Sequence, residues 1–597
     1  MARRTGIKSG QARSVAKEQP LPGGDSRRGG VRTSPWLVAA SVGASFALFF
    51  IIYSLRLDQV VGLVVDDAWY VMLARALATG HGYTLINSPS AGIPPFYPPA
   101  FPWLLSLLFR LAPQFPQNLW LLKSVSIMAM PGVGAASYVW LRRVRELPHY
   151  PALGIATVVS VTPAFCFLAT STVMTECVFT LAQLLTILTI ERGVRVTVKG
   201  GTSWWYWVLG ATFGSFAFLT RSIALGLIAA AVGYLLKERL FRGAAIFAFS
   251  VIALVGPWMA YSRAHSPTGE QRAEQGGNIV LSYTTQFWQK KAGDSASGTV
   301  YAADLPDRVW NNLTQVLGHD IGMMLFPPFL RDTGYSGAEA IEEAGGRSIL
   351  SFLLGLFVVA GFIATAIRKA TLAEFALPAS LVIILLWPWP PYRFILPFAP
   401  FIVFYFLTGL RLIQQLKQRV DGTSKLRAQW PVFGVAVVCI LAAHLYDHTR
   451  YIVKKFQPVA ADRPLWLRAF EENRAMLEWV SKKAPEDCVI ATPNPALVYL
   501  FTGRKTISFT NPQGNWERWN QIGMRYLVRT SVTPVPKPDV FTEARYDIPY
   551  TSRGELKLRV VDFGPPSIRL PWGSNDPSKG RIMLEGIREP APGTQIR

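Results

Sequence analysis

The amino-acid sequence predicts a mainly α-helical protein that crosses a membrane many times and carries a small extracytoplasmic α/β domain at its C-terminus. Half of the 597 residues are hydrophobic, and the mean hydropathy of +0.26 is too high for a soluble chain of this length. Windows of about 20 residues without charge recur along the chain, which is typical of spanning helices. From 448 onward, shorter apolar runs alternate with helical patterns instead.

The N-terminal segment is polar and basic. Residues 1–35 are rich in Gly, Ser and Arg and contain eight Lys or Arg residues. We expect a disordered cytoplasmic tail, because the segment has too few apolar residues to form a core and because basic residues favour the cytoplasmic side. The apolar segment 36–55 is too long for a cleavable signal peptide and many others follow it, so it is predicted to cross the membrane outward.

About eleven apolar segments are predicted to span the membrane. They are 36–55, 118–140, 151–171, 177–190, 204–219, 222–236, 243–262, 348–367, 373–389, 394–410 and 430–447. With this assignment, every short loop rich in Lys and Arg lies on the cytoplasmic side. The alternation requires 100–112, which is short, to be an interfacial or re-entrant helix. The net charge of +23 then reflects orientation in a membrane, expected to be a bacterial plasma membrane, and no nucleic-acid partner is predicted.

Three regions follow from this pattern. They are the tail 1–35, a transmembrane domain 36–447 with extracytoplasmic loops 56–117 and 263–345, and an extracytoplasmic α/β domain 448–597. In the last region, strands are predicted at 488–492, 506–509, 524–529 and 556–563, with a short helix at 495–502. The part beyond Pro571 is rich in Pro, Gly and Ser and is expected to be loose.

The stretch from Asp66 to Trp103 follows the first span directly. Read as a helix, its first part places apolar residues on one stripe with Asp66 and Tyr70 near the edge, so that Asp66 would face inward. A proline-dense run around Tyr97 follows and cannot be regular helix. A carboxylate-bearing helix is an unusual way to leave a bilayer, although Asp66 or Asp67 could equally cap a helix N-terminus.

Three more charged residues fall at outward turns between predicted spans. Glu176 lies in the turn before 177–190, Arg221 before 222–236 and Arg393 before 394–410. Glu176 could be a solvated loop acid and the arginines could snorkel to lipid headgroups. Together with Asp66 and Asp67, however, they place acids and arginines on one face of the bilayer. Arginine binds phosphate oxygens through a fork of donors, and a carboxylate is a suitable base for a hydroxyl or amine. The set therefore indicates transfer from a lipid phosphate.

Several short motifs, in this order and sidedness, resemble the GT-C glycosyltransferases, in particular the branch with protein O-mannosyltransferases and the lipid A aminoarabinose transferase. The motifs are Asp66-Asp67 with Tyr70, the run Tyr97 to Trp103, Thr175-Glu176, Thr220-Arg221 and Tyr392-Arg393 followed by Pro397 and Pro400. The resemblance covers roughly 36–447 and implies a sugar donor carried on a polyprenyl phosphate.

The resemblance also implies roles for residues. Asp66 would be the base or acceptor-orienting carboxylate, Asp67 stands where the family often has Glu, and Glu176 matches the second acid. Arg221 and Arg393 match positions that neutralise the lipid phosphate, and Tyr70, Tyr97 and Tyr392 complete the predicted donor site. The aminoarabinose branch carries a lysine where this chain has Tyr97, so one phosphate-binding cation of that branch is missing.

The predicted chemistry is an inverting transfer to an extracytoplasmic lipid, protein or glycan acceptor. Two arginines would stabilise the leaving phosphate, so no cofactor is required, although Asp66, Asp67 and Glu176 are hard oxygen ligands that could hold a divalent metal. Two other functions use similar features. A lipid-linked saccharide transporter would favour charges within spans and symmetric halves. An O-antigen polymerase or ligase gives no reason for an acid-bearing helix directly after the first span.

Overall fold

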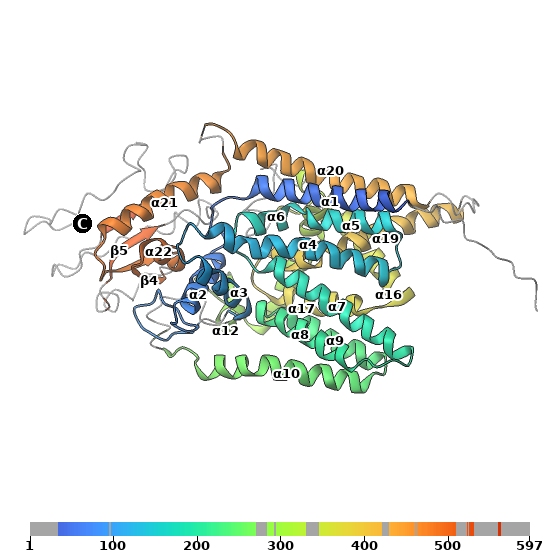
Figure 1. Ribbon diagram of the computed structural model, residues 1–597, viewed down its shortest axis with the longest axis horizontal. Helices are drawn as coiled ribbons and strands as arrows, with labels where there is room; N and C mark the ends of the chain where they lie inside the picture. Colours follow the sequence, from blue (N-terminus) through green and yellow to red (C-terminus); the bar gives the residue numbers. More distant parts are fainter. Residues whose placement is uncertain are drawn as a thin grey trace, which may run out of the picture. The chain divides into compact units, whose positions relative to one another are not determined.

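The computed structural model describes residues 34–94, 97–269, 271, 283–291, 294–329, 345–420, 429–459, 463–508, 522, 524–529 and 559–562 (Figure 1). The chain divides into two compact units, Met1–Ser45 and Phe46–Arg597. In the first unit, residues 35–45 form the beginning of helix α1 (Pro35–Arg56). The second unit contains all other described elements. Most of the predicted disordered tail and the predicted loose C-terminus lie outside the described residues.

The second unit is mainly helical, as predicted. Before the long loop that follows residue 264 its helices are α2 (Asp66–Ala78), α3 (Ala100–Leu111), α4 (Leu119–Arg143), α5 (His149–Ser160), α6 (Pro163–Thr170), α7 (Glu176–Val198), α8 (Trp204–Thr220), α9 (Ala224–Lys237) and α10 (Phe241–Ala264). After that loop come α16 (Ile349–Lys369), α17 (Leu372–Leu386), α18 (Tyr392–Ile395), α19 (Ala399–Val420) and α20 (Gln429–Lys455). In Figure 1, α4, α7, α8 and α9 run side by side, and α7 packs against both α4 and α8.

The described part of the long loop between α10 and α16 has its own secondary structure. Its elements are α12 (Tyr283–Phe287), a hairpin of β1 (Gln289–Lys291) and β2 (Asp294–Thr299), η2 (Ala302–Asp304), α13 (Leu305–Gln315), the π-helical turn η3 (Val316–Asp320), α14 (Ile321–Leu325) and η4 (Pro327–Phe329). α13 packs against α17, and η3 contacts α16 and α18. The loop therefore lies against the ends of the helices that follow it in the chain.

Seven of the described helices are long and apolar enough to cross a membrane, or eight if α5 and α6, which are bent by 46°, form one broken span. Three further predicted spans correspond to α8, α9 and α17, which have 17, 14 and 15 residues. Helices of that length rise about 21–26 Å, less than the roughly 30 Å of a bilayer's hydrocarbon core. Each predicted segment thus matches a helix or the bent pair, but the count of eleven spans is not confirmed. Helix α3 is also too short to span, and it packs against α2.

The later helices pack at close range. A Cβ atom at Gly361 of α16 would lie 1.8 Å from the carbonyl oxygen of Tyr405 in α19, so only glycine permits this approach. Directly before α19, the 3₁₀ turn η5 (Leu396–Phe398) contacts α7 and α18. This packing fixes α18, the one-turn helix that carries Arg393, at the start of the span Tyr392–Gln415.

The C-terminal region contains a four-stranded parallel sheet in the order β4-β3-β5-β6. Its elements are α21 (Leu465–Lys483), β3 (Val489–Thr492), α22 (Pro495–Thr502), β4 (Lys505–Ser508), β5 (Met524–Arg529) and β6 (Arg559–Asp562). All four residues of β3 are buried, as expected for a central parallel strand. The strands and α22 coincide with the predicted elements to within a few residues.

The sheet and α22 contact the loops on both sides of α2, through Asn87 after that helix and Gly62 before it. The side chain of Asn87 donates to the Thr506 carbonyl at 3.3 Å, and the Thr506 amide donates back to the Asn87 carbonyl at 2.7 Å. The Asn494 side chain donates to the Gly62 carbonyl at 3.1 Å. Gly62 has φ +86°, and a Cβ there would lie 2.9 Å from Leu497 of α22. Position 62 therefore requires glycine for two reasons, the positive φ and the lack of space for a Cβ atom.

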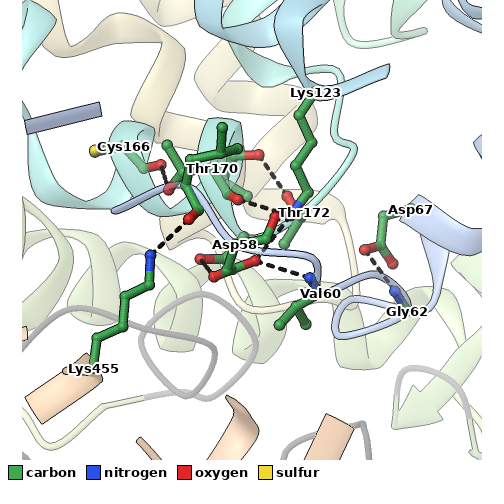
Figure 2. Close-up of polar contacts among 12 residues, drawn as sticks. Asp58, Val60, Gly62, Asp67, Lys123, Cys166, Thr170, Thr172 and Lys455 are labelled. Carbon is green, nitrogen blue, oxygen red and sulfur yellow. Dashed lines mark hydrogen bonds and ion pairs between the residues drawn. The ribbon is translucent and has the colours of Figure 1, made fainter. Parts of the chain in front are cut away.

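A buried ion pair holds the chain where it leaves α1 (Figure 2). Lys123 of α4 contacts the Asp58 carboxylate at 2.9 Å and donates to the carbonyls of Asp58 and Thr170 at 2.8 and 2.7 Å. The side chains of Lys123 and Asp58 are 0% and 3% exposed. The Asp58 carboxylate also accepts from Ser171 at 2.6 Å. Sequence analysis did not select this pair, although a lysine inside an apolar segment is a recognisable signal.

We expect Lys123→Met to destabilise the protein by about 3–5 kcal/mol, because it leaves the Asp58 carboxylate buried without its counter-ion. The unfolding temperature of the detergent-purified variant measures this. The double variant K123M/D58N should lose less than the two single variants combined. Lys237→Met is the matched control, because its partner Glu238 is 30% exposed and Lys237 itself is 50% exposed. Equal unfolding temperatures for K123M and K237M would contradict the assignment.

Candidate active site

Asp66 is the first residue of α2 and faces a cavity. One carboxylate oxygen accepts a hydrogen bond from the Tyr97 hydroxyl at 2.5 Å, and the other accepts from Arg393 Nη2 at 2.9 Å. The Tyr83 hydroxyl donates to the carbonyls of Tyr97 and Pro98, which holds the proline-rich run against this helix. Asp66 is 19% exposed, so its carboxylate is reachable from the cavity.

Glu176 is the first residue of α7 and is fully buried. One of its oxygens, Oε1, lies 2.5 Å from Arg221 Nη1 and 3.5 Å from Arg393 Nε. Arg221 also donates to the Thr175 hydroxyl at 2.9 Å. The other oxygen, Oε2, makes no hydrogen bond to the described part of the chain. A carboxylate at a helix N-terminus is further favoured by the helix dipole.

Glu176, Arg221 and Arg393 come from three turns that are far apart in the sequence but meet in the structure. Arg221 is the C-cap of α8 and has an extended backbone, and Arg393 is the second residue of α18. Asp66, Glu176, Arg221 and Arg393 form a continuous chain of ion pairs in which Arg393 bridges the two acids. The structure therefore brings together four of the predicted site residues.

The cavity beside these residues has a volume of about 350 Å³. Its lining combines the charged residues Asp66, Arg221 and Arg393 with many aromatic and aliphatic side chains. The remaining lining residues are Tyr70, Tyr97, Pro98, Thr220, Ser222, Ile223, Leu225, Tyr283, Gln286, Ile383, Ile384, Trp387, Trp389 and Phe394. An anionic head with an apolar tail fits such a lining.

Burial keeps the tyrosines of the site protonated. Desolvation, followed by the charge of Asp66, raises the pKa of both Tyr70 and Tyr97. Desolvation raises the pKa of Tyr283 to about 12. The ring centroids of Tyr70 and Tyr97 lie 5.0 Å apart. Tyr97 is therefore a hydrogen-bond donor to Asp66 rather than a second anion beside it.

Two predicted site residues do not reach the cavity. Asp67 is fully buried, and its carboxylate accepts from the amide of Gly62 at 2.8 Å and that of Ala68 at 3.0 Å (Figure 2). Consecutive helical residues point about 100° apart, so Asp66 and Asp67 cannot share one direction. Tyr392 is 1% exposed and is not among the lining residues. Neither residue lines the cavity, and the substrate roles predicted for them stay predictions.

Sequence analysis did not predict that the long loop between α10 and α16 supplies residues to the cavity. Tyr283 and Gln286 of α12 line the cavity, as do Trp387 and Trp389 after α17. Tryptophans are common at the membrane–water interface in any membrane protein, so their presence in the sequence did not indicate a binding site. Among the described residues, no group of three or more His, Cys, Asp or Glu side chains is arranged to hold a metal ion.

The helical arrangement resembles that of solved structures. ArnT from Cupriavidus metallidurans bound to undecaprenyl phosphate matches with a TM-score of 0.50 and 12% identity, over 82% of this chain and 88% of that chain. The oligosaccharyltransferase of Archaeoglobus fulgidus in its apo form matches with a TM-score of 0.47 and 13% identity, over 81% of this chain and 65% of that chain. No family model and no curated protein sequence matches the chain.

This is a GT-C-like fold. The resemblance predicted from the short motifs is thus confirmed at the level of the fold. At 12% identity the likeness extends to the fold alone, and a fold does not determine a reaction. The reaction has to be argued from the four charged residues and the cavity beside them.

Asp67 offers a test by pH. Desolvation raises the pKa of its carboxyl from 3.8 to about 6 in the folded protein. Its protonation therefore favours the folded state, and this stabilisation is complete below pH 3.8 and is lost as the pH rises through about 6. Asparagine at this position does not titrate. We expect the unfolding temperature of D67N minus that of the wild type to increase between pH 4 and about pH 6.5. A constant difference over that range would show that Asp67 does not titrate in this way.

Proposed function

We propose that this protein is a membrane glycosyltransferase that transfers a sugar from a polyprenyl-phosphate donor to an extracytoplasmic acceptor. The observation that carries the proposal is the convergence of one partly exposed carboxylate, Asp66, and two arginines, Arg221 and Arg393, on a single cavity with an apolar side. The GT-C-like fold supports it, since the similar ArnT structure holds undecaprenyl phosphate. The site is assigned to the outer face of a bacterial plasma membrane, with the N-terminus in the cytoplasm.

The two arginines are assigned to the donor phosphate. Both contact carboxylates in the absence of substrate, Arg221 at Glu176 and Arg393 at Asp66 and Glu176. Their remaining N–H groups can bind phosphate oxygens while Glu176 holds the guanidinium planes in place. The leaving group is then stabilised in a partly dry site, where such electrostatic stabilisation is strongest.

Asp66 is assigned as the base. The bond between the anomeric carbon and the phosphate oxygen breaks, and the bond from the acceptor hydroxyl or amine to that carbon forms from the opposite face, so the anomeric centre is inverted. The acceptor's proton passes to Asp66, and polyprenyl phosphate leaves with the bonding electrons. The Tyr97 hydroxyl, at 2.5 Å from one oxygen of Asp66, and Arg393 Nη2, at 2.9 Å from the other, orient the carboxylate toward the cavity.

The apolar side of the cavity is assigned to the polyprenyl chain. Ile223, Ile383 and Trp389 line it, and Leu225 combines a position in the lining with 56% exposure. An exposed apolar rim lets the lipid tail stay in the bilayer while the phosphate reaches the arginines. An acceptor therefore has to approach from the side of α12, which lies beside the same cavity.

We expect Asp66→Asn to lower sugar transfer by at least about a hundredfold while the protein stays inserted and folded, because general bases contribute on the order of 10²–10⁴. Membranes with wild type, D66N or the control E146Q are offered a panel of radiolabelled polyprenyl-phosphate sugars. Release of lipid phosphate is followed together with transfer of label to endogenous acceptors. Glu146 is a suitable control because its side chain is 75% exposed and is not part of the cavity.

Either of two results would overturn the proposal. Normal transfer by D66N would remove the proposed base. Labelled lipid that changes leaflet in wild-type membranes without sugar transfer would instead favour a transporter. A donor turned over by wild type and E146Q but not by D66N would support the enzyme and identify its sugar.

We expect transfer to continue after chelation of divalent metals with EDTA. Arg221 and Arg393 supply the positive charge that a metal would otherwise bring to the phosphate. The measurement is the initial rate of label transfer before and after treatment with EDTA. A loss that added Mg²⁺ or Mn²⁺ restores would assign a metal to the site, with Asp66 and Glu176 as its hard oxygen ligands.

A further inference from the structure

Helix α13 holds two walls of the candidate active site without lining it. One wall is α12, with Tyr283 and Gln286, and the other is the segment that ends α17, with Trp387 and Trp389. Helix α13 packs against α17. Among the described residues that line the cavity, none belongs to α13, and the proposed sugar transfer gives this helix no role of its own.

Arg308 and Asn312 lie on the side of α13 that contacts α17. They are four residues apart, which places them on one face of the helix. Asn312 Nδ2 donates to the carbonyl of Leu385 at 3.0 Å and to that of Trp387 at 2.9 Å. Arg308 Nη1 donates to the carbonyl of Leu386 at 3.3 Å. These bonds join α13 to the last turn of α17 and to its C-cap, Trp387.

The two side chains together cap α17. The last carbonyls of a helix have no partner within the helix, and here α13 supplies donors to three consecutive carbonyls. The guanidinium of Arg308 also places a positive charge at the negative end of the helix dipole. Beyond the cap, Trp387 is extended, with φ −78° and ψ 141°, and three prolines within 388–391 follow. Because proline has a fixed φ, the direction set at the cap is carried along a stiff turn to Trp389.

The same guanidinium holds α12. Arg308 Nη1 donates to the carbonyl of Phe287 at 2.7 Å, and Nη2 donates to that of Gln289 at 2.6 Å. Phe287 is the last residue of α12, and Gln289 is the first residue of β1. The planar fork of an arginine can serve carbonyls of two segments at once. Arg308 therefore joins the end of α12 to the end of α17.

We propose that Arg308 and Asn312 are positioning residues of the sugar transfer, which hold the α12 wall and the Trp387–Trp389 wall together around the lipid-linked donor. The assignment rests on the proposed function, in which Ile383 and Trp389 contact the polyprenyl chain. These apolar contacts are the same before and during the transfer, so loosening the wall weakens donor binding and leaves the chemical step unchanged.

The reacting groups are held by other contacts. Arg393 is tied to Asp66 at 2.9 Å and to Glu176 at 3.5 Å, and Arg221 is tied to Glu176 at 2.5 Å. These ion pairs do not involve α13. Substitution of Asn312 should therefore change the affinity for the donor without removing the proposed base or the phosphate-binding arginines.

Asn311 provides a matched control for Asn312. It is the same residue type at the next position of α13, and it is exposed. Its backbone carbonyl accepts from Arg347 at 3.2 Å and from the Thr314 hydroxyl at 3.0 Å. Alanine retains that carbonyl, so N311A changes the composition of α13 as N312A does but leaves the contacts with α17 in place.

The binding test uses full-length wild type, N312A, R308A and N311A in neutral-detergent micelles, with undecaprenyl phosphate as the probe. We expect N312A and R308A to bind the probe at least about tenfold more weakly than wild type, the equivalent of one or two hydrogen bonds. N311A should bind it as wild type does. Hydrogen exchange should be faster over residues 381–389 in N312A and R308A, and faster over 283–291 in R308A.

Steady-state kinetics separate positioning from a general loss of folding. With the labelled donor that wild type turns over, N312A should raise KM about tenfold and leave kcat unchanged, because only donor binding is weakened. A smaller fraction of folded enzyme would instead lower kcat at an unchanged KM.

Two results would overturn this inference and leave the proposed function standing. One is binding of undecaprenyl phosphate with equal affinity by wild type, N312A and N311A. The other is a lower kcat at unchanged KM in N312A. Failure of wild type itself to bind undecaprenyl phosphate would count against the proposed function, and the positioning role in donor binding would fall with it. If R308A does not fold, the comparison of N312A with N311A decides the question.

Discussion

The Glu176 carboxylate, shared between Arg221 and Arg393, is the interaction on which the candidate site depends. It joins the start of α7, the end of α8 and the short helix α18. Glu176 is fully buried, and a buried charge without a partner is strongly destabilising. The three turns therefore have to meet. Since Arg393 also contacts Asp66, the same constraint places the carboxylate of α2 beside the two cations.

Asp66 and Asp67 are adjacent in α2 but lie in different environments. Asp66 is partly exposed and contacts side chains that face the cavity. Asp67 is buried and accepts two backbone amides, which ties the start of α2 to the Gly62 loop. Between them and the loop, Val65 has φ +57°, a conformation that a β-branched residue adopts only under constraint. The contacts of Asp67 with the amides of Gly62 and Ala68 supply that constraint on the backbone around Asp66.

Much of the fold was predictable because apolar length and basic loops identify helices and their ends. The sides assigned to Glu176, Arg221 and Arg393 followed from the same pattern, and the structure places the three within one ion-pair chain. Rotation about a helix axis was not predictable in the same way. Neither the inward direction of Tyr392 nor the divergence of Asp66 and Asp67 follows from the period of a short segment. Sequence analysis also did not predict that Tyr283 lines the cavity. Its position depends on how the long loop between α10 and α16 packs on α17 and α18, and not on its local sequence.

The change in composition near 448 marks a different kind of structure, but its described elements are not separate from the site. Asn494 donates to the Gly62 carbonyl, the Gly62 amide donates to Asp67, and Asp67 directly follows Asp66 in the first turn of α2. These contacts run continuously from the parallel sheet to the proposed base. Any displacement of α22 would remove the Asn494 donor from the Gly62 carbonyl. The geometry of Asp66 therefore depends on the packing of a region almost 430 residues away in sequence.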